Sequence, residues 1–146
     1  MKTERAFWDT SAIIPLCVLQ ETTVSARKAN RIFTVKVVWW GTAVEVRSSL
    51  ARLKRTGELE APGFDVALHK WLQMNKRGHE IKPSQRLLDI AAELPDQFAL
   101  KALDAFQLAA ALAWCGERPR KRPFVCADKR LGDAAERAGF DVVSLV

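Results

Sequence analysis

Short apolar runs alternate with longer amphipathic stretches along this chain, and this order predicts an α/β fold. We expect four strands, which cover residues 4–8, 33–40, 124–127 and 141–145. The run at 33–40 is rich in β-branched and aromatic side chains, which favour extended structure.

The stretches between these runs carry apolar residues at helical spacing. The predicted helices cover residues 11–19, 22–32, 42–57, 64–76, 84–94, 100–114 and 129–138. Pro95 is expected to close the fifth helix at Leu94, and Gly139 is expected to end the last one. The side of the fifth helix expected to face the core contains Leu87, Leu88, Ala91 and Ala92.

Three acids stand where predicted strands give way to helices. Asp9 ends the first strand, Glu45 lies in the first turn of the helix after the second, and Asp128 follows the third. Each has a structural alternative, because Asp9 and Asp128 can cap the next helix and Thr42 with Glu45 has the spacing of a capping box. Since such junctions share one edge of a parallel sheet, we expect the three acids to converge there.

Asp104 interrupts the predicted helix at 100–114, which is otherwise apolar on most faces. A lone ionised carboxylate in such surroundings is costly unless it is paired or bound to metal, and no cap explains it in mid-segment. If this helix packs over the same sheet edge, four hard oxygen ligands meet, which suits Mg²⁺ or Mn²⁺. At about 5 Å and an effective dielectric of roughly 20, each carboxylate pair repels by about 3 kcal/mol, so cations or protons are needed.

The net charge of +6 and the sequence pI near 9.5 favour an acidic partner such as nucleic acid. Basic side chains gather on a predicted helical hairpin at about 42–78 and in the loop at 118–123, although such a loop can also be merely solvated. The candidate nucleic-acid-binding residues are Arg47, Arg52, Lys54, Arg55, Arg120, Lys121 and Arg122.

The length of 146 residues, with 49% hydrophobic and 27% charged, predicts one globular domain over residues 1–146. No run approaches the roughly 20 apolar residues of a membrane span, and the start does not match a signal peptide, so a cytoplasmic location is expected. Cys17, Cys115 and Cys126 are odd in number and far apart. This pattern favours reduced core thiols over disulfides or a zinc site.

Four segments carry a family resemblance through their order and spacing. They are Phe7-Trp8-Asp9-Thr10-Ser11-Ala12, Glu45 at its helix start, Leu103-Asp104-Ala105-Phe106-Gln107-Leu108-Ala109-Ala110-Ala111, and Val125-Cys126-Ala127-Asp128-Lys129-Arg130-Leu131 followed by Ala134-Ala135 and Gly139. In these segments, which span nearly the whole chain, the sequence resembles the PIN-domain ribonucleases, and more closely the small VapC-type toxins of toxin-antitoxin pairs.

The resemblance implies a three-layer α/β/α sandwich with a mostly parallel central sheet. It also implies a catalytic and metal-binding site made of Asp9, Glu45, Asp104 and Asp128, with a supporting hydroxyl from Thr10 or Ser11. Many members carry Ser or Thr where this chain has Cys126. The hydroxyl that those members have at this position is therefore absent here.

For activity, the resemblance implies a Mg²⁺- or Mn²⁺-dependent endoribonuclease that acts as the toxin of a type II pair. Its implied partners are RNA, an antitoxin encoded beside it, and a second copy in a homodimer. Metal held by the carboxylates would lower the pKa of a bound water, which would attack a phosphodiester in line without a covalent intermediate.

The alternative is a binding module on the same fold, with the acids as caps and the basic hairpin as the working surface. A receiver-type phosphoacceptor fits less well, because it needs paired acids after the first strand and Asp9 stands alone. The sequence has no Ser/His/Asp arrangement, no G-x-x-x-x-G-K-[ST] and no G-x-G-x-x-G, which argues against hydrolase triads, P-loop enzymes and dinucleotide enzymes.

Overall fold

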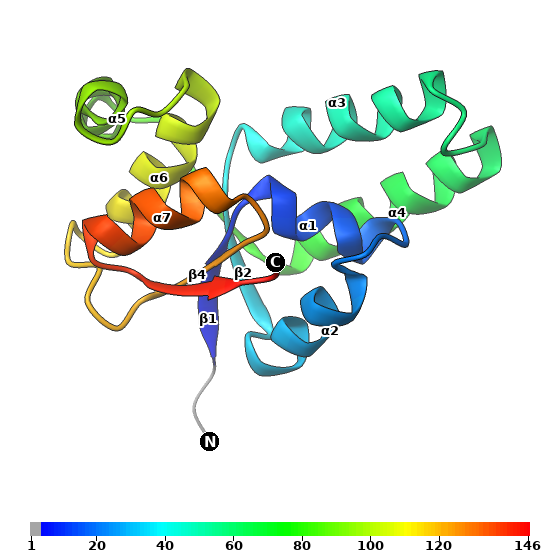
Figure 1. The fold of residues 1–146 in the computed structure, drawn as a ribbon, viewed down its shortest axis with the longest axis horizontal. Coiled ribbons are helices and arrows are strands. Elements are labelled where there is room, and N and C mark those ends of the chain that lie inside the picture. The colour runs from blue at the N-terminus through cyan, green and yellow to red at the C-terminus, as the bar shows by residue number, and fades with distance from the viewer. Residues whose placement is uncertain (1–3) are drawn as a thin grey trace.

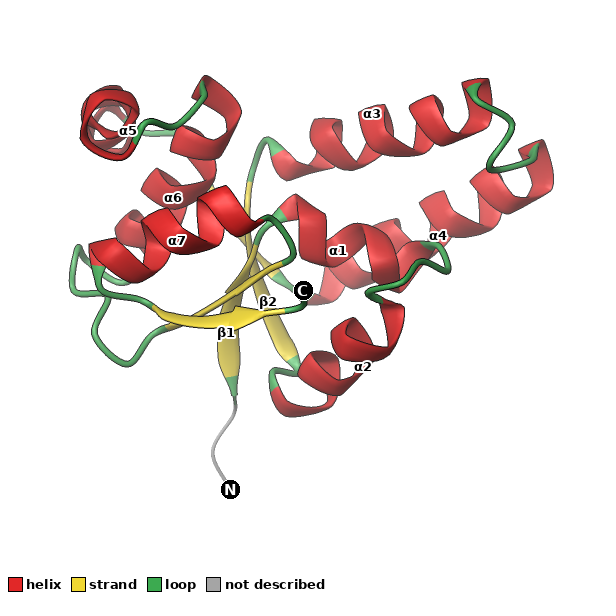
Figure 2. Cartoon of the chain, viewed as in Figure 1, coloured by secondary structure: helices red, strands yellow, loops and turns green. Residues whose placement is uncertain are grey.

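A computed structural model describes residues 4–146, and its centre is a five-stranded, fully parallel sheet with helices on both faces (Figures 1 and 2). The strand order is β3-β2-β1-β4-β5, so β1 lies in the middle. The strands are β1 (Arg5–Trp8), β2 (Val35–Trp39), β3 (His79–Ile81), β4 (Pro123–Cys126) and β5 (Asp141–Ser144). The expected α/β class is confirmed.

Helices cover the sheet in two groups, one on each face (Figure 1). The first group is α1 (Thr10–Cys17), α2 (Thr23–Ile32), α3 (Thr42–Arg55) and α4 (Ala61–Arg77). The second is α5 (Gln85–Phe98), α6 (Ala102–Trp114) and α7 (Lys129–Ala138). Among these helices, none is both long and apolar enough to cross a membrane.

The central strand shows why the chain folds into layers. Ala6 and Trp8 point into the core under α1–α4, whereas Phe7 points into the opposite core and stacks on Phe124 at 5.4 Å between ring centroids. All three β1 side chains are fully buried, as expected for a parallel strand covered on both faces.

Strand register brings the carboxyl ends of β1, β2 and β4 together. Phe7 of β1 pairs with Val37 of β2 and with Phe124 of β4. The residues that follow these three strands therefore emerge side by side at one edge of the sheet, as expected from the sequence.

The structure departs from the prediction at one strand and at one helix end. The edge strand β3 was not predicted. It has only three residues, none of which is fully buried, so it forms no apolar run in the sequence. The fifth helix does not close at Leu94 but continues through Pro95 to Phe98, and Ala99 ends it in the left-handed conformation at φ 54°.

The reason for this extension is packing. Leu94 and Phe98 pack against the core beneath α5, while Pro95 removes only one backbone donor. The buried side of α5 is also rotated from the prediction, since Leu88 is 49% exposed and Ile90 is buried instead.

Gly132 of α7 and Gly139, which follows the helix as its C-cap, should respond oppositely to alanine. Gly139 ends the helix at φ 116°, where a Cβ would lie 3.0 Å from Cγ of Pro119. Gly139→Ala should therefore destabilise the protein by about 2 kcal/mol.

In the helix interior, a Cβ on Gly132 would meet only ordinary contacts with Val142 and Cys126. Gly132→Ala should stabilise by up to about 1 kcal/mol, as measured by urea unfolding. Equal effects at the two positions would contradict this account.

Candidate functional site

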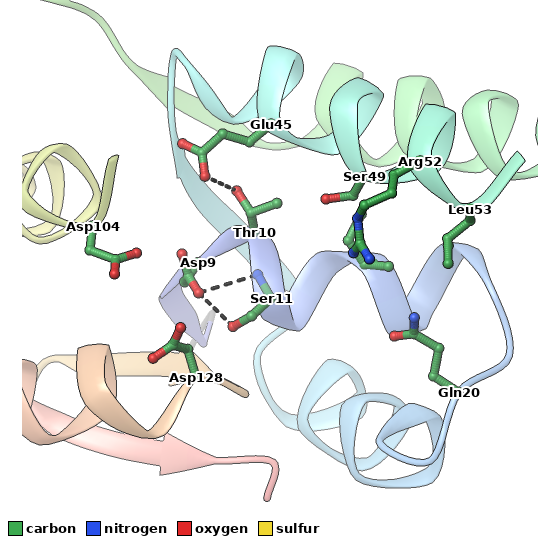
Figure 3. Close-up of a pocket in the computed structure, with 11 residues that line it drawn as sticks. Asp9, Thr10, Ser11, Gln20, Glu45, Ser49, Arg52, Leu53, Asp104 and Asp128 are labelled. Atoms are coloured by element: carbon green, nitrogen blue, oxygen red, sulfur yellow. Dashed lines mark hydrogen bonds between the residues drawn. The ribbon is translucent and has the colours of Figure 1, made fainter. Parts of the chain in front are cut away.

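A pocket at the carboxyl edge of the sheet contains all four predicted acids (Figure 3). Its volume is about 330 Å³. It is lined by Asp9, Thr10, Ser11, Ile14, Gln20, Glu45, Ser49, Arg52, Leu53, Asp104 and Asp128. We call it the acid pocket.

Asp9 both caps a helix and lines this pocket. It follows β1, is the N-cap of α1, and is only 4% exposed. Its Oδ2 accepts hydrogen bonds from the backbone N–H of Ser11 at 3.2 Å and from the Ser11 hydroxyl at 2.5 Å. The Ser11 hydroxyl oxygen also accepts from the N–H of Ala127 at 2.9 Å, which ties the ends of β1 and β4 together. The cap and a functional role are therefore compatible at Asp9.

Glu45 lies in the first turn of α3 but caps nothing. The N-cap of α3 is Gly41, and no side chain caps this helix, so the capping-box alternative is wrong. Instead Oε1 of Glu45 accepts from the Thr10 hydroxyl at 3.1 Å, and Oε2 accepts from Nε2 of Gln107 at 3.1 Å. Both carboxylate oxygens are held by groups from other helices, which fixes the side chain toward the pocket.

Asp128 repeats the arrangement of Asp9 at the end of β4. It is the N-cap of α7, and its Oδ1 accepts from the backbone N–H of Leu131 at 2.9 Å. Cys126 lies between the two acids, with its Sγ 4.0 Å from Oδ2 of Asp9 and 3.2 Å from the backbone N of Asp128. Burial raises the pKa of this thiol to about 12, so Cys126 is a neutral, weakly polar neighbour of the acids.

The position of Asp104 differs from the prediction. It lies in the first turn of α6 and is half-buried, rather than in mid-helix and deeply packed. The helix dipole favours an acid there, so the argument that no helix end explains Asp104 is wrong. Its side chain nevertheless points into the pocket, toward Asp9 and Asp128 (Figure 3).

Burial and mutual repulsion make Asp9, Glu45 and Asp104 hard to ionise. Burial, joined by the charges of Glu45 and Asp104, raises the pKa of Asp9 to about 7 against the two Ser11 hydrogen bonds. Burial also raises the pKa of Glu45, and that of Asp104 rises through burial and the charge of Asp128. The pocket therefore favours the binding of protons or cations.

The acids share a pocket without forming a closed ligand cage. Over residues 4–146, no group of three His, Cys, Asp or Glu side chains is placed closely enough to hold one metal ion. The carboxylates of Asp9, Asp104 and Asp128 nevertheless turn toward a common space (Figure 3). A cation shared among the acids would need side-chain adjustment within this space.

Gln107 belongs to the site, although sequence reasoning did not select it. This fully buried residue of α6 directs Nε2 at the hydroxyls of Thr10 and Thr42, each at 3.0 Å, and at Glu45. The available signal was an amide in an otherwise apolar helix, three residues after Asp104 and so on the same helical face.

Only part of the predicted basic set reaches the acid pocket. Arg52 of α3 lines it. Arg47 and Lys54 lie over the ring of Phe64, at 5.8 and 4.9 Å from its centroid, and so connect α3 with α4. Arg55 is exposed at the end of α3.

The basic loop lies away from the acids. Arg120, Lys121 and Arg122 precede β4, whereas Asp128 follows it, so in a parallel sheet they lie at opposite edges. The Arg122 guanidinium lies 5.3 Å from the ring centroid of Trp114. A role for this loop in RNA binding stays a prediction, and the structure does not bring it to the pocket.

No protein-family model matches this chain, and no curated protein matches its sequence. Chains of solved structures are similar in fold, among them the following two. A chain of a toxin-antitoxin complex from Klebsiella pneumoniae aligns over 97% of this chain and 98% of its own, with 18% identity and a TM-score of 0.65. The protein PAE2754 from Pyrobaculum aerophilum aligns over 97% of this chain and 90% of its own, with 15% identity and a TM-score of 0.66. At these identities the likeness establishes a shared fold.

Without a cation, the stability of the protein should fall as pH rises from about 4 to about 7. Asp9 holds its proton more tightly in the folded protein, with a pKa of about 7, than in the unfolded chain at 3.8. The folded state therefore binds more protons across this window, and the loss is on the order of 4 kcal/mol.

Urea unfolding in EDTA at several pH values measures this loss. Asp9→Asn should flatten the profile, because an amide oxygen can still accept from Ser11 but does not titrate. Asp133→Asn, on the exposed side of α7, is the control and should keep the wild-type slope. An unchanged slope in Asp9→Asn would show that another group causes the pH dependence.

Proposed function

We propose that this protein is a Mg²⁺- or Mn²⁺-dependent ribonuclease of the PIN-domain type and the toxin of a type II toxin-antitoxin pair. The observation that carries the proposal is the convergence of Asp9, Glu45, Asp104 and Asp128, from the N-terminal ends of four helices, on one pocket. Segments far apart in the sequence supply these acids, and at least Glu45 serves no capping purpose.

The donor set fits a hard divalent cation. All four candidate ligands are carboxylates, which Mg²⁺ and Mn²⁺ prefer. Burial and mutual repulsion raise the pKa of Asp9, Glu45 and Asp104, so a cation would relieve an existing electrostatic cost. When bound to these acids, the cation would supply a water of lowered pKa and would neutralise charge on the phosphodiester.

The residues of the chain orient the acids and contact the substrate. Ser11 fixes Asp9 through two hydrogen bonds, and Thr10 fixes Glu45. Arg52, the one basic residue among the described residues that line the pocket, is placed to contact a substrate phosphate. No side-chain nucleophile is needed, because the attacking group in this proposal is water.

The fold supports the proposed biological role. It is shared with a chain of the Klebsiella pneumoniae toxin-antitoxin complex over nearly the full length of both. We therefore include a cognate antitoxin among the proposed partners, with RNA as substrate, a homodimer as the assembly and the cytoplasm as the location.

A non-catalytic binding module is the second candidate. Asp9 and Asp128 cap α1 and α7, and Asp104 and Glu45 lie in the first turns of α6 and α3, where the helix dipole favours an acid, so each acid has a structural use. Glu45 still distinguishes the two functions, because both of its carboxylate oxygens accept from other helices, through Thr10 and Gln107, and neither caps its own helix. A set of caps also gives no reason for Mn²⁺ to raise the melting temperature.

Purified protein should cleave total RNA in the presence of Mg²⁺ or Mn²⁺, and this cleavage should stop in EDTA. Asp9→Asn should lower cleavage by at least about 100-fold, because it removes one ligand charge while its amide keeps the helix cap. Asp133→Asn, an exposed acid of α7 paired with Lys129, is the matched control and should cleave normally. The amount of cut RNA ends, determined when the ends are mapped, measures the cleavage activity. Cleavage that persists in EDTA, or in Asp9→Asn, would overturn the proposal.

Arg52 should contribute to RNA binding more than the basic loop does. Arg52→Gln should weaken the binding of single-stranded RNA and lower the slope of log affinity against log salt by about 0.7, the value for one lost phosphate contact. Arg120→Gln, at the opposite edge of the sheet, should change neither quantity. Filter-binding titrations at several salt concentrations test this. If Arg120→Gln weakens binding and Arg52→Gln does not, the RNA contacts the basic loop instead.

A further inference from the structure

Gln107 lies at a junction of three helices beside the acid pocket. It belongs to α6, and its Nε2 meets the first residues of α1 and α3, Thr10 and Thr42, as well as Glu45. The side chain is fully buried. A buried amide normally needs partners for both of its ends, yet within the described residues Oε1 of Gln107 has none.

Two of the three acceptors around Nε2 of Gln107 lead to Glu45, and the third is the Thr42 hydroxyl. Nε2 carries two hydrogens and has no acceptor capacity, so it donates, and its two hydrogens are shared among these three acceptors. The Thr10 hydroxyl can accept from Gln107 while it donates to Oε1 of Glu45, and Gln107 also reaches Oε2 of Glu45 directly. Both carboxylate oxygens of Glu45 thus depend on Gln107, one directly and one through Thr10.

The unpaired Oε1 shows that this arrangement is not optimised for stability alone. Leaving a buried acceptor without a partner costs free energy that an apolar side chain of similar size would not cost. The position therefore suits a residue retained for its donors. Asp104 lies one turn before Gln107 on α6, so the same helix face contributes a pocket acid and the group that orients Glu45.

We infer that Gln107 is a positioning residue that orients Glu45 for binding a divalent cation in the acid pocket. The inference rests on the proposed function of that pocket. Groups that orient metal ligands typically change metal affinity by about 10- to 100-fold when they are replaced.

The test is the affinity of the metal-free protein for Mn²⁺ alone, measured by calorimetry at neutral pH. Gln107→Met keeps the approximate size but removes the donors, and should weaken Mn²⁺ binding by about 10- to 100-fold. Gln107→His places an N–H at a similar reach and should recover part of the loss. Gln85→Met, on the exposed start of α5, removes an amide that bonds only to nearby Asp89 and should bind Mn²⁺ like wild type.

A double-mutant cycle separates positioning from a structural role. If Gln107 acts through Glu45, then Glu45→Gln should remove most of the effect of Gln107→Met on Mn²⁺ affinity. Additive effects would indicate that Gln107 only supports the fold, and would overturn the inference. If Gln107→Met does not give a folded circular dichroism spectrum, Gln107→Leu takes its place in the cycle.

The outcomes for the two proposals are distinct. If wild type fails to bind Mn²⁺, the proposed function of the pocket is overturned. If wild type binds but Gln107→Met binds equally well, only the role of Gln107 is overturned.

Discussion

The burial of Asp9 at the end of the central strand is the constraint on which the site depends. Because β1 is covered on both faces, the residue that follows it leaves a dry interior, and Asp9 remains only 4% exposed. The two donors of Ser11 offset part of the desolvation, but the pKa of Asp9 still rises to about 7. The neighbouring charges of Glu45 and Asp104 add repulsion to this desolvation, so folding and full ionisation of the pocket oppose each other.

Helix capping is part of how this site is built, rather than a rival explanation for it. In a parallel sheet, a strand that is followed by a crossover helix needs a strand-to-helix turn at its end. Such turns favour Asp as the N-cap of the helix. Asp9 and Asp128 meet that need with one oxygen each, Oδ2 and Oδ1 respectively. Their remaining oxygens are left for the pocket, so the same residues can serve folding and ligand binding.

Sequence patterns located the elements and acids whose signals are local. The strands around Phe7 and Phe124 and the end of α7 at Gly139 followed from apolar runs and turn chemistry. The continuation of α5 through Pro95 could not be predicted, since packing of Phe98 against a distant core decides it. Gln107 escaped notice for the same reason, because its partners lie 97, 65 and 62 residues away along the chain.

The charge distribution bears on the order in which ligands can bind. The chain carries a net charge of +6, which favours polyanions at long range, yet the acid pocket presents carboxylates where the proposed function would place a scissile phosphate. Arg52 on the pocket wall, with Lys101 and Arg130 near Asp104, offsets part of this negative charge. On the proposed function, a phosphate can enter only after a cation has neutralised the acids, or together with it. RNA held by the basic helices without a cation would therefore remain outside the pocket, bound but uncut.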